Sequence, residues 1–178
     1  DYFVITTNVD GQFMKTGFAP EHFFEVQGNY GEWQCSVPCR QEVFDNEEAV
    51  MEMLKEIKDL KIPTDLLPYC PNCGAQMTMH LRVDQSFVQN ETWEASYEAY
   101  LGFIEGIEDQ KVVFLELGVG YNTPTIIRYP FEKMTAVFPK AHLIRLNRDD
   151  LEGFAATKEK TISINDDMRE VLQQWLAD

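Results

Sequence analysis

Four cysteines in two close pairs constrain this chain more than any other feature. The pairs are Cys35-Ser-Val-Pro-Cys39 and Cys70-Pro-Asn-Cys73, and thirty residues separate them. Two pairs of thiolates make the closed, tetrahedral site that zinc prefers, and four sulfur ligands leave no open position for catalysis. The spacing therefore predicts one structural zinc ion on Cys35, Cys39, Cys70 and Cys73. Disulfides and free thiols are the alternatives, and the lack of a secretory signal disfavours disulfides.

The charge balance argues against nucleic acid as a partner. The chain has 15 Lys and Arg against 30 Asp and Glu, a formal net charge of −15, whereas phosphate binding depends on Lys and Arg. Solubility explains this charge, and a preference for basic partners is the alternative. No apolar run approaches the roughly 20 residues that a membrane span needs. We therefore expect a cytoplasmic protein with neither nucleic-acid nor membrane partners.

A continuous apolar run near residue 112 marks the second half of the chain as α/β. Val112–Leu115 is typical of a parallel strand that is buried on both faces. Gly118-Val119-Gly120 follows at once, and Thr123-Pro124 then predicts the cap and first residue of a helix. Strands are predicted at 142–146 and 161–164, with a last helix capped by Asn165. This order predicts part of a Rossmann-like parallel sheet.

The region around the cysteines shows weaker but specific patterns. Asp45, with Glu48 three residues on, predicts the start of a helix between the two cysteine pairs. The run 77–82 alternates, which predicts a strand with Met77, Met79 and Leu81 on one face and Thr78, His80 and Arg82 on the other. On this basis His80 is a polar surface group. An aromatic stripe from Trp93 to Ile104 predicts a helix that packs against the core.

Several motifs in order resemble the sirtuins, a family of NAD-consuming enzymes. Thr6-Thr7-Asn8-Val9-Asp10-Gly11 resembles the sirtuin T-Q-N-I-D-G segment, and Gln27-Gly28 falls where sirtuins carry a catalytic His-Gly. The zinc ribbon follows, as in that family. Leu117-Gly118-Val119-Gly120 then resembles the G-T-S loop, and Leu146-Asn147 the I-N pair that ends the next strand. The resemblance covers essentially the whole chain.

Two departures refine this resemblance. The sirtuin Gly-Ala-Gly-x-S phosphate loop does not occur here, so we expect the chain to be the C-terminal part of a longer protein. Gln27 replaces the catalytic His and Thr7 the usual Gln, and Arg82 follows the zinc ribbon. In these respects the sequence is most similar to the class M sirtuins, which are macrodomain-linked protein ADP-ribosyltransferases.

The resemblance implies which residues form the site. Asn8, Asp10, Gln27 and Arg82 are the predicted catalytic residues. The predicted NAD contacts are Thr7, Asn8, Asp10, Gln27, Gly118, Val119, Gly120, Asn147 and Arg148. Taken by themselves, Asn8 and Asp10 are turn formers, Gly118 and Gly120 suit a tight turn, and Arg82 suits a surface strand residue paired with Asp84.

Gln27 decides between two kinds of chemistry. Sirtuin deacylation needs a general base that titrates near neutral pH, and losing such a base typically lowers the rate by ~10²–10⁴-fold. A glutamine amide has no accessible protonation change. ADP-ribosyl transfer to a carboxylate needs no such base, because the acceptor is already ionised at neutral pH. The sequence therefore favours a protein ADP-ribosyltransferase that uses NAD, with Arg82 holding the acceptor carboxylate.

Two other functions stay open at this point. A deacylase or delipoylase would release a free acyl-ADP-ribose, and a non-catalytic NAD-binding module would bind NAD without turnover. The class M resemblance implies a protein substrate, specifically a lipoyl-carrier protein of the glycine-cleavage H type, and a macrodomain hydrolase as a second partner. The predicted domains are a Rossmann-like part at 1–29, a zinc-binding small domain with a helical insert at 30–82, and a second Rossmann-like part at 83–178.

Overall fold

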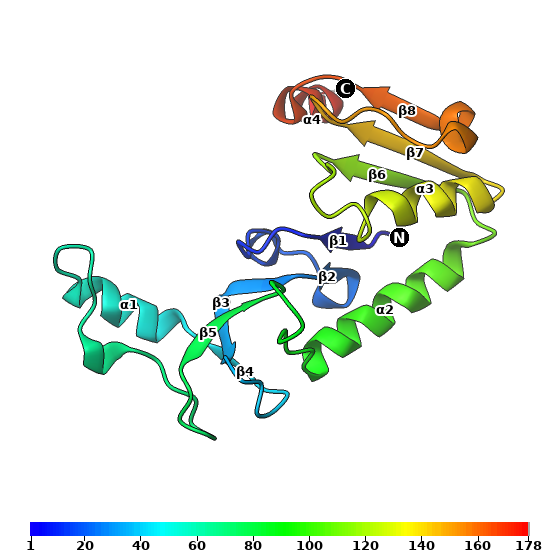
Figure 1. Ribbon diagram of the computed structural model, residues 1–178. Helices are drawn as coiled ribbons and strands as arrows, with labels where there is room; N and C mark the ends of the chain where they lie inside the picture. Colours follow the sequence, from blue (N-terminus) through cyan, green and yellow to red (C-terminus); the bar gives the residue numbers. More distant parts are fainter. Residues whose placement is uncertain (178) are drawn as a thin grey trace. The chain divides into compact units, whose positions relative to one another are not determined.

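The computed structural model describes residues 1–177 and divides into two units, Asp1–Tyr100 and Leu101–Asp178 (Figure 1). Each unit is described by itself. Asp178, the last residue of the predicted 83–178 segment, lies outside the described residues, and the three-part division at 1–29, 30–82 and 83–178 stays a prediction. No helix within residues 1–177 is both long and apolar enough to cross a bilayer.

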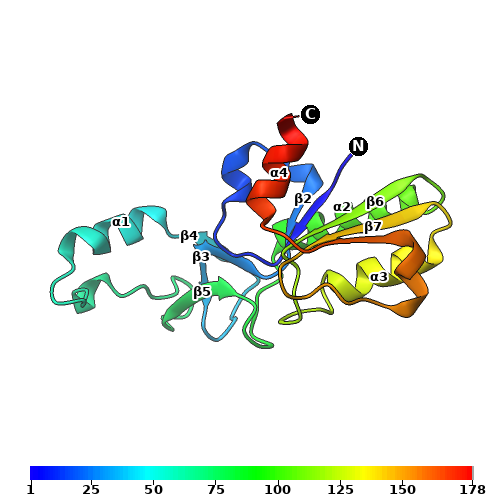
Figure 2. The same ribbon diagram turned by 90° about the horizontal axis from the view of Figure 1, so that it is seen from above.

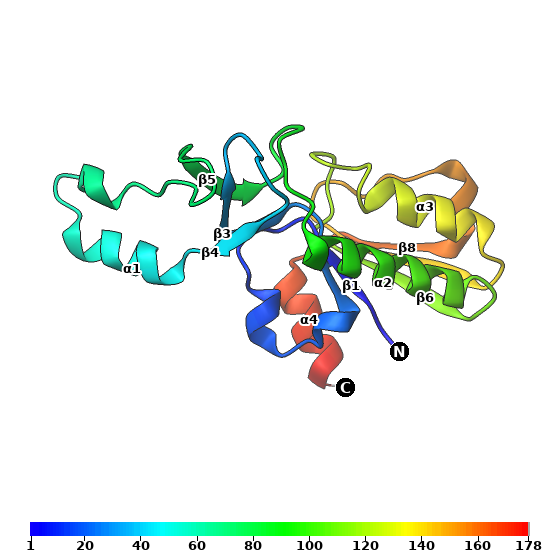
Figure 3. The same cartoon turned by 90° about the horizontal axis from the view of Figure 1, so that it is seen from below.

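The first unit contains two small sheets. In the first, β1 (Val4–Thr6) and β2 (Phe23–Glu25) pair in parallel. In the second, β3 (Gly28–Cys35) is the central strand and pairs antiparallel with β4 (Val43–Asp45) and β5 (Met77–Leu81). The chain leaves β4 into α1 (Glu47–Glu56) before it returns to β5, as Figure 3 shows. Short 3-10 helices lie at Phe13–Thr16, Pro20–His22 and Thr64–Leu66.

A compact cluster joins the cysteine pairs to the three-stranded sheet. Trp33, Cys35, Cys70 and Met77 are buried together, and Val50 and Met53 of α1 pack against them. The predicted helix between the cysteine pairs is therefore present, and its apolar stripe faces this cluster. Asn46 occupies its cap position, while the Asp45 carboxylate accepts a hydrogen bond from the Glu47 N–H at 3.0 Å.

The predicted alternation along β5 is wrong at His80. The His80 side chain is 3% exposed, whereas Met79, predicted to share a face with the buried Met77, is 39% exposed. The pairing of β3 with β5 shifts register between Asn29 and Trp33, so a strict two-residue period does not run through the strand. Arg82 lies just beyond the end of β5 and is exposed.

The second unit is a parallel α/β layer, as predicted. Its sheet has the strand order β6–β7–β8, formed by Val112–Leu117, Ala141–Leu146 and Thr161–Ile164. Figure 2 shows α3 (Arg128–Val137) along one face of the sheet and α4 (Met168–Ala177) near the carboxyl ends of the strands. A 3-10 helix at Ala155–Lys160 precedes β8. The long helix α2 (Glu91–Ile107) runs across the boundary at Tyr100.

The strand predicted to be buried on both faces is covered on one. Phe114 and Glu116 of β6 are buried, and the Phe114 ring lies 4.8 Å from that of Phe131 in α3. Val113 on the opposite face is 57% exposed. Apolar composition alone predicted two covered faces, whereas α3 packs against only one of them.

Two predicted helix starts are displaced along the chain. The helix expected from Thr123-Pro124 begins at Arg128 instead. Pro130 explains this shift, because a proline is tolerated in the first turn but would break the interior of a helix that began at residue 124. Asn165 does not cap α4, because the Asp167 carboxylate accepts the N–H groups of Arg169 and Glu170 at 2.9 and 3.2 Å.

Candidate active site and metal centre

The four cysteines come together as predicted. Their sulfur atoms all lie within 4.8 Å of one another, and the Cys35–Cys73 and Cys39–Cys70 pairs are each 3.6 Å apart. A tetrahedral zinc ion with Zn–S bonds of about 2.3 Å places its sulfurs about 3.8 Å apart. The Cys39 backbone N–H lowers the pKa of Cys35 to about 7, whereas desolvation raises that of Cys39 to about 12. The donor set and its geometry fit a structural zinc ion.

The loop that carries Thr7, Asn8 and Asp10 is fastened to the turn at Gln27 by main-chain bonds. Val26 N–H donates to Thr6 C=O at 3.1 Å, and Tyr30 N–H donates to Val9 C=O at 2.9 Å. The Thr6 hydroxyl accepts the Asn8 N–H at 3.0 Å. These bonds place the predicted loop residues and Gln27 on neighbouring segments of one unit.

Gly28 allows a close approach that another residue would block. Its φ of +82° lies in the left-handed region, and a Cβ atom there would overlap the carbonyl oxygen of His80. Glycine is therefore required beside Gln27 for both backbone conformation and space. This close approach brings the Gln27 turn against the end of β5.

Arg82 is joined directly to Gln27. Its backbone N–H donates to the Gln27 carbonyl at 3.0 Å. Its guanidinium lies over the rings of Phe87 and Trp93, at 5.4 and 5.6 Å from their centroids. The alternative pairing with Asp84 is absent among the described residues, because the Asp84 carboxylate accepts instead from Ser86. Arg82 is thus an exposed cation held beside the Gln27 turn by two aromatic rings.

A carboxyl group with a perturbed pKa lies next to this turn. Burial raises the pKa of Glu25, the negative charges of Glu32 and Asp10 raise it further, and the hydrogen bond from Asn29 lowers it. That bond, from the Asn29 amide to the Glu25 carboxylate, is 2.9 Å long. Glu25 is therefore a weakly acidic carboxyl two residues before Gln27, and the sequence motifs did not single it out.

The predicted NAD contacts of the second unit also gather in one place. Gly118 has a φ of +65°, and its N–H donates to the Leu146 carbonyl at 2.9 Å. The Asn147 amide donates to the Val119 carbonyl at 3.1 Å, and its oxygen accepts the N–H groups of residues 149 and 150. The loops after β6 and β7 are thereby tied together, with Gly120 and Arg148 beside them.

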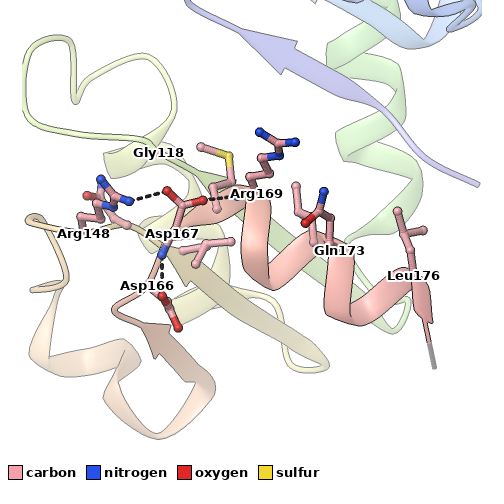
Figure 4. A pocket seen from close by; sticks show the side chains of 11 residues that line it. Gly118, Arg148, Asp166, Asp167, Arg169, Gln173 and Leu176 are labelled. Carbon is pink, nitrogen blue, oxygen red and sulfur yellow. Dashed lines mark hydrogen bonds and ion pairs between the residues drawn. The ribbon is translucent and has the colours of Figure 1, made fainter.

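A pocket of about 710 Å³ opens at this end of the sheet (Figure 4). The strand ends and α4 line it, and Figure 4 shows the Arg148 guanidinium directed at the Asp167 carboxylate. Its lining comprises Gly118, Leu146, Asn147, Arg148, Asp166, Asp167, Met168, Arg169, Leu172, Gln173 and Leu176. Sequence reasoning found only the loop residues. The other wall of the pocket is formed by α4 and the residues just before it. The sequence signal for that wall was the pair Asp166-Asp167, which precedes an amphipathic helix.

Sequence reasoning also missed a buried charge network beneath the loops. Arg145 of β7 donates to Glu116 at 2.6 and 3.1 Å and to Glu132 of α3 at 2.6 Å, and all three side chains are essentially inaccessible. Nearby, Arg128 donates to the carbonyls of Val119, at 2.7 Å, and of residue 150, at 3.0 Å. The sequence signal for this network was a charged residue within each of two apolar strands, Glu116 and Arg145. These side chains brace the loops that border the pocket.

The predicted site residues thus fall in two groups. Thr7, Asn8, Asp10, Gln27 and Arg82 come together in the first unit. The residues at 118–120, with Asn147 and Arg148, come together in the second.

Comparisons with known proteins agree with the motifs. The sequence is 32% identical over 168 residues to a Staphylococcus aureus protein named protein ADP-ribosyltransferase, covering 94% of this chain and 53% of that protein. It is 33% identical over 141 residues to a probable bifunctional ADP-ribose hydrolase/ADP-ribosyltransferase of Fusarium oxysporum f. sp. cubense, covering 75% of this chain and 23% of that protein. The chain therefore spans about half of the first relative and about a quarter of the second. No model of a known protein family matches.

Solved structures identify the fold. The structure of Sir2 bound to an acetylated peptide aligns with 98% of this chain and with 62% of the Sir2 chain, with a TM-score of 0.59 at 16% identity. A Sir2 mutant with a p53 peptide and NAD matches 99% and 65%, with a TM-score of 0.56 at 17% identity. A mutant Sir2 homologue in complex with ADP-ribose matches 98% and 58%, with a TM-score of 0.56 at 15% identity.

Together, the solved structures show a Sir2-like fold, as the sequence predicted. In sequence, the chain is similar to two proteins whose names both include ADP-ribosyltransferase.

Proposed function

We propose that the protein containing this chain is an NAD-dependent protein ADP-ribosyltransferase of the sirtuin type. It transfers ADP-ribose from NAD to a protein side chain and releases nicotinamide. The observation behind this proposal is the placement of Gln27, a residue without base chemistry, beside Arg82, an exposed cation whose backbone N–H donates to the Gln27 carbonyl. The names of the two sequence relatives support it.

The roles of the site residues follow from their chemistry. NAD supplies a ribose whose bond to nicotinamide breaks with the electron pair leaving on nicotinamide, while an oxygen of the acceptor carboxylate bonds to the ribose carbon. Gln27 donates or accepts a hydrogen bond at a ribose hydroxyl. Arg82 holds the acceptor carboxylate through parallel N–H bonds. Asn8 and Asp10 orient the reacting ribose from the adjoining loop.

The pocket of the second unit suits the nucleoside half of NAD. Its volume of about 710 Å³ falls within the roughly 300–1,000 Å³ of small-molecule sites. Leu146, Met168 and Leu172 offer apolar surface for a flat base, and Asn147 and Arg148 offer polar groups for the ribose and phosphate. We assign adenosine binding to this pocket on that basis.

Single substitutions in the intact protein test the transfer site. Asn8→Ala is expected to lower protein labelling from radiolabelled NAD by about a hundredfold, because small misplacements of the reacting ribose are costly. Gln27→Ala is expected to lower it by only about two- to tenfold, since a hydrogen bond contributes ~0.5–1.5 kcal/mol. Arg82→Ala is expected to raise the KM for the acceptor protein more than the Kd for NAD.

An exposed glutamine on the zinc ribbon provides the control. Gln41→Ala removes a side chain of the same type as Gln27 at an exposed position of the ribbon, and it should leave labelling unchanged. The same assays include a panel of acyl-lysine peptides. Brisk release of acyl-ADP-ribose without protein labelling would replace the transferase with a deacylase. NAD binding without either product would show that the protein is a non-catalytic NAD-binding module.

A glycine substitution tests the nucleoside pocket. Gly118→Ala places a Cβ at a φ of +65° and 3.2 Å from the Met168 methyl group. Left-handed strain of roughly 1–2 kcal/mol, relieved by moving the loop, corresponds to about a tenfold loss of affinity for ADP-ribose. Calorimetric titration of the intact protein measures this loss. Gly102→Ala, where a Cβ in α2 meets nothing within 4 Å, should bind normally, and equal affinities in both variants would rule out this pocket.

The partners follow from the same proposal. The acceptor is a protein, and we propose a lipoyl-carrier protein of the glycine-cleavage H type. A macrodomain hydrolase that removes the ADP-ribose is the second proposed partner, supported by the bifunctional name of the Fusarium relative. We place the protein in the cytoplasm, because reduced thiolates are needed to hold zinc.

A further inference from the structure

His80 is the one buried histidine among the described residues, and none of the proposed chemistry uses it. Its side chain is 3% exposed, and both ring nitrogens have partners. Nδ1 lies 2.9 Å from a carboxylate oxygen of Glu32, and Nε2 lies 2.8 Å from the main-chain carbonyl of Val88. The ring also stacks on Phe87, with centroids 4.6 Å apart and planes 2° from parallel.

Both partners of the ring are acceptors. A carbonyl oxygen has no proton to donate, and an ionised carboxylate also only accepts. The Glu32 side chain is 43% exposed, so water reaches its carboxylate. Both hydrogen bonds can form together only when each ring nitrogen carries hydrogen, which makes the ring a cation.

The two bonds connect the zinc-binding sheet to the loop after β5. Glu32 belongs to β3, and Val88 lies in the loop between β5 and α2. Gln34 of β3 holds the same loop, because its amide donates to the Ser86 carbonyl at 2.8 Å and accepts the Val88 N–H at 3.0 Å. Phe87 lies between Ser86 and Val88, and the Arg82 guanidinium lies over its ring. His80 therefore contacts the same ring as Arg82.

We propose that His80 is a doubly protonated positioning residue that fastens the 84–88 loop to the zinc-binding sheet and so holds Arg82 in place. The charged group in contact with the ring is Glu32 on β3, and the Arg82 guanidinium lies over Phe87, the ring on which His80 stacks. Asp84 in the loop accepts from the Ser86 N–H. The consequence for ADP-ribosyl transfer rests on the proposed function, whereas the charge and the fastening of the loop do not.

Nuclear magnetic resonance of the intact, zinc-loaded protein with ¹⁵N-labelled histidine tests the charge directly. At pH 7 both ring nitrogens of His80 are expected to resonate in the protonated range, each with an attached hydrogen. His142, which is exposed on β7, is the internal reference. A single protonated nitrogen in His80 would overturn the proposal, and this measurement needs no variant that might fail to fold.

Two variants separate the charge from the fastening. In Glu32→Gln the ring loses its counter-charge, so Nδ1 should lose its hydrogen while the bond to Val88 and the ring-current shift of the Arg82 side chain remain. In His80→Gln one amide cannot reach both partners, so the Arg82 ring-current shift should disappear and the KM for the acceptor protein should rise several-fold. The Kd for ADP-ribose and the zinc content should not change.

His142→Gln is the matched control and should alter none of these readouts. An unchanged Arg82 shift in His80→Gln with full zinc content would show that His80 does not position Arg82. Absence of protein labelling by the wild-type protein would instead defeat the proposed function, while the resonance data would still decide the role of His80.

Discussion

Replacing Cys70 with serine is expected to unfold the three-stranded sheet of the first unit. Cys35 and Cys70 are buried in the cluster that holds β3, β5 and α1 together, so the four-cysteine site lies where the small sheet has its core. Structural zinc contributes about 10–16 kcal/mol in zinc-finger peptides, which is comparable to the roughly 5–15 kcal/mol stability of a whole domain. Thermal unfolding with parallel metal analysis measures the effect.

Ser36→Ala is the appropriate control. Ser36 is exposed between two zinc ligands in sequence, so the variant tests whether any change in the knuckle has this effect. It should keep one equivalent of zinc and a melting temperature near that of the wild type. A folded Cys70→Ser protein without metal would show that the four thiols are not a structural zinc site.

Arg145→Met is expected to cause the second large loss of stability. The arginine is the only cation that contacts both Glu116 and Glu132 among the residues that the structure describes, and all three side chains are buried. Burial already raises the pKa of Glu116. Removing one partner of a buried pair leaves uncompensated charge and typically costs about 3–5 kcal/mol. Denaturant unfolding of the intact protein would show this as a lower midpoint.

Arg148→Met tests the same change of residue at the surface. The Arg148 side chain, which pairs with Asp167, is 67% exposed. Exposed ion pairs contribute only ~0–1 kcal/mol to the free energy of unfolding. The midpoint should therefore move little in Arg148→Met. Equal shifts in the two variants would mean that the buried network contributes no more than a surface pair.

Local patterns predicted the elements better than their boundaries. The apolar runs of the second half became the parallel strands β6, β7 and β8. The start of α3 moved to Arg128 because Pro130 restricts where a helix can begin. The cap of α4 is Asp167 rather than Asn165, and the two acidic side chains at 166 and 167 were the overlooked signal.

Residue types and their spacing were enough to predict the chemistry of the two sites. Cysteine spacing predicted a four-thiolate zinc site, and Gln27 with Arg82 predicted a site without a histidine base, because ligand type and proton chemistry belong to the residues themselves. The burial of His80 between Glu32 and Val88, and the contact of Arg145 with two glutamates, became visible only in the folded chain. Those contacts join segments up to 48 residues apart, and they depend on strand register and packing, which no local pattern encodes.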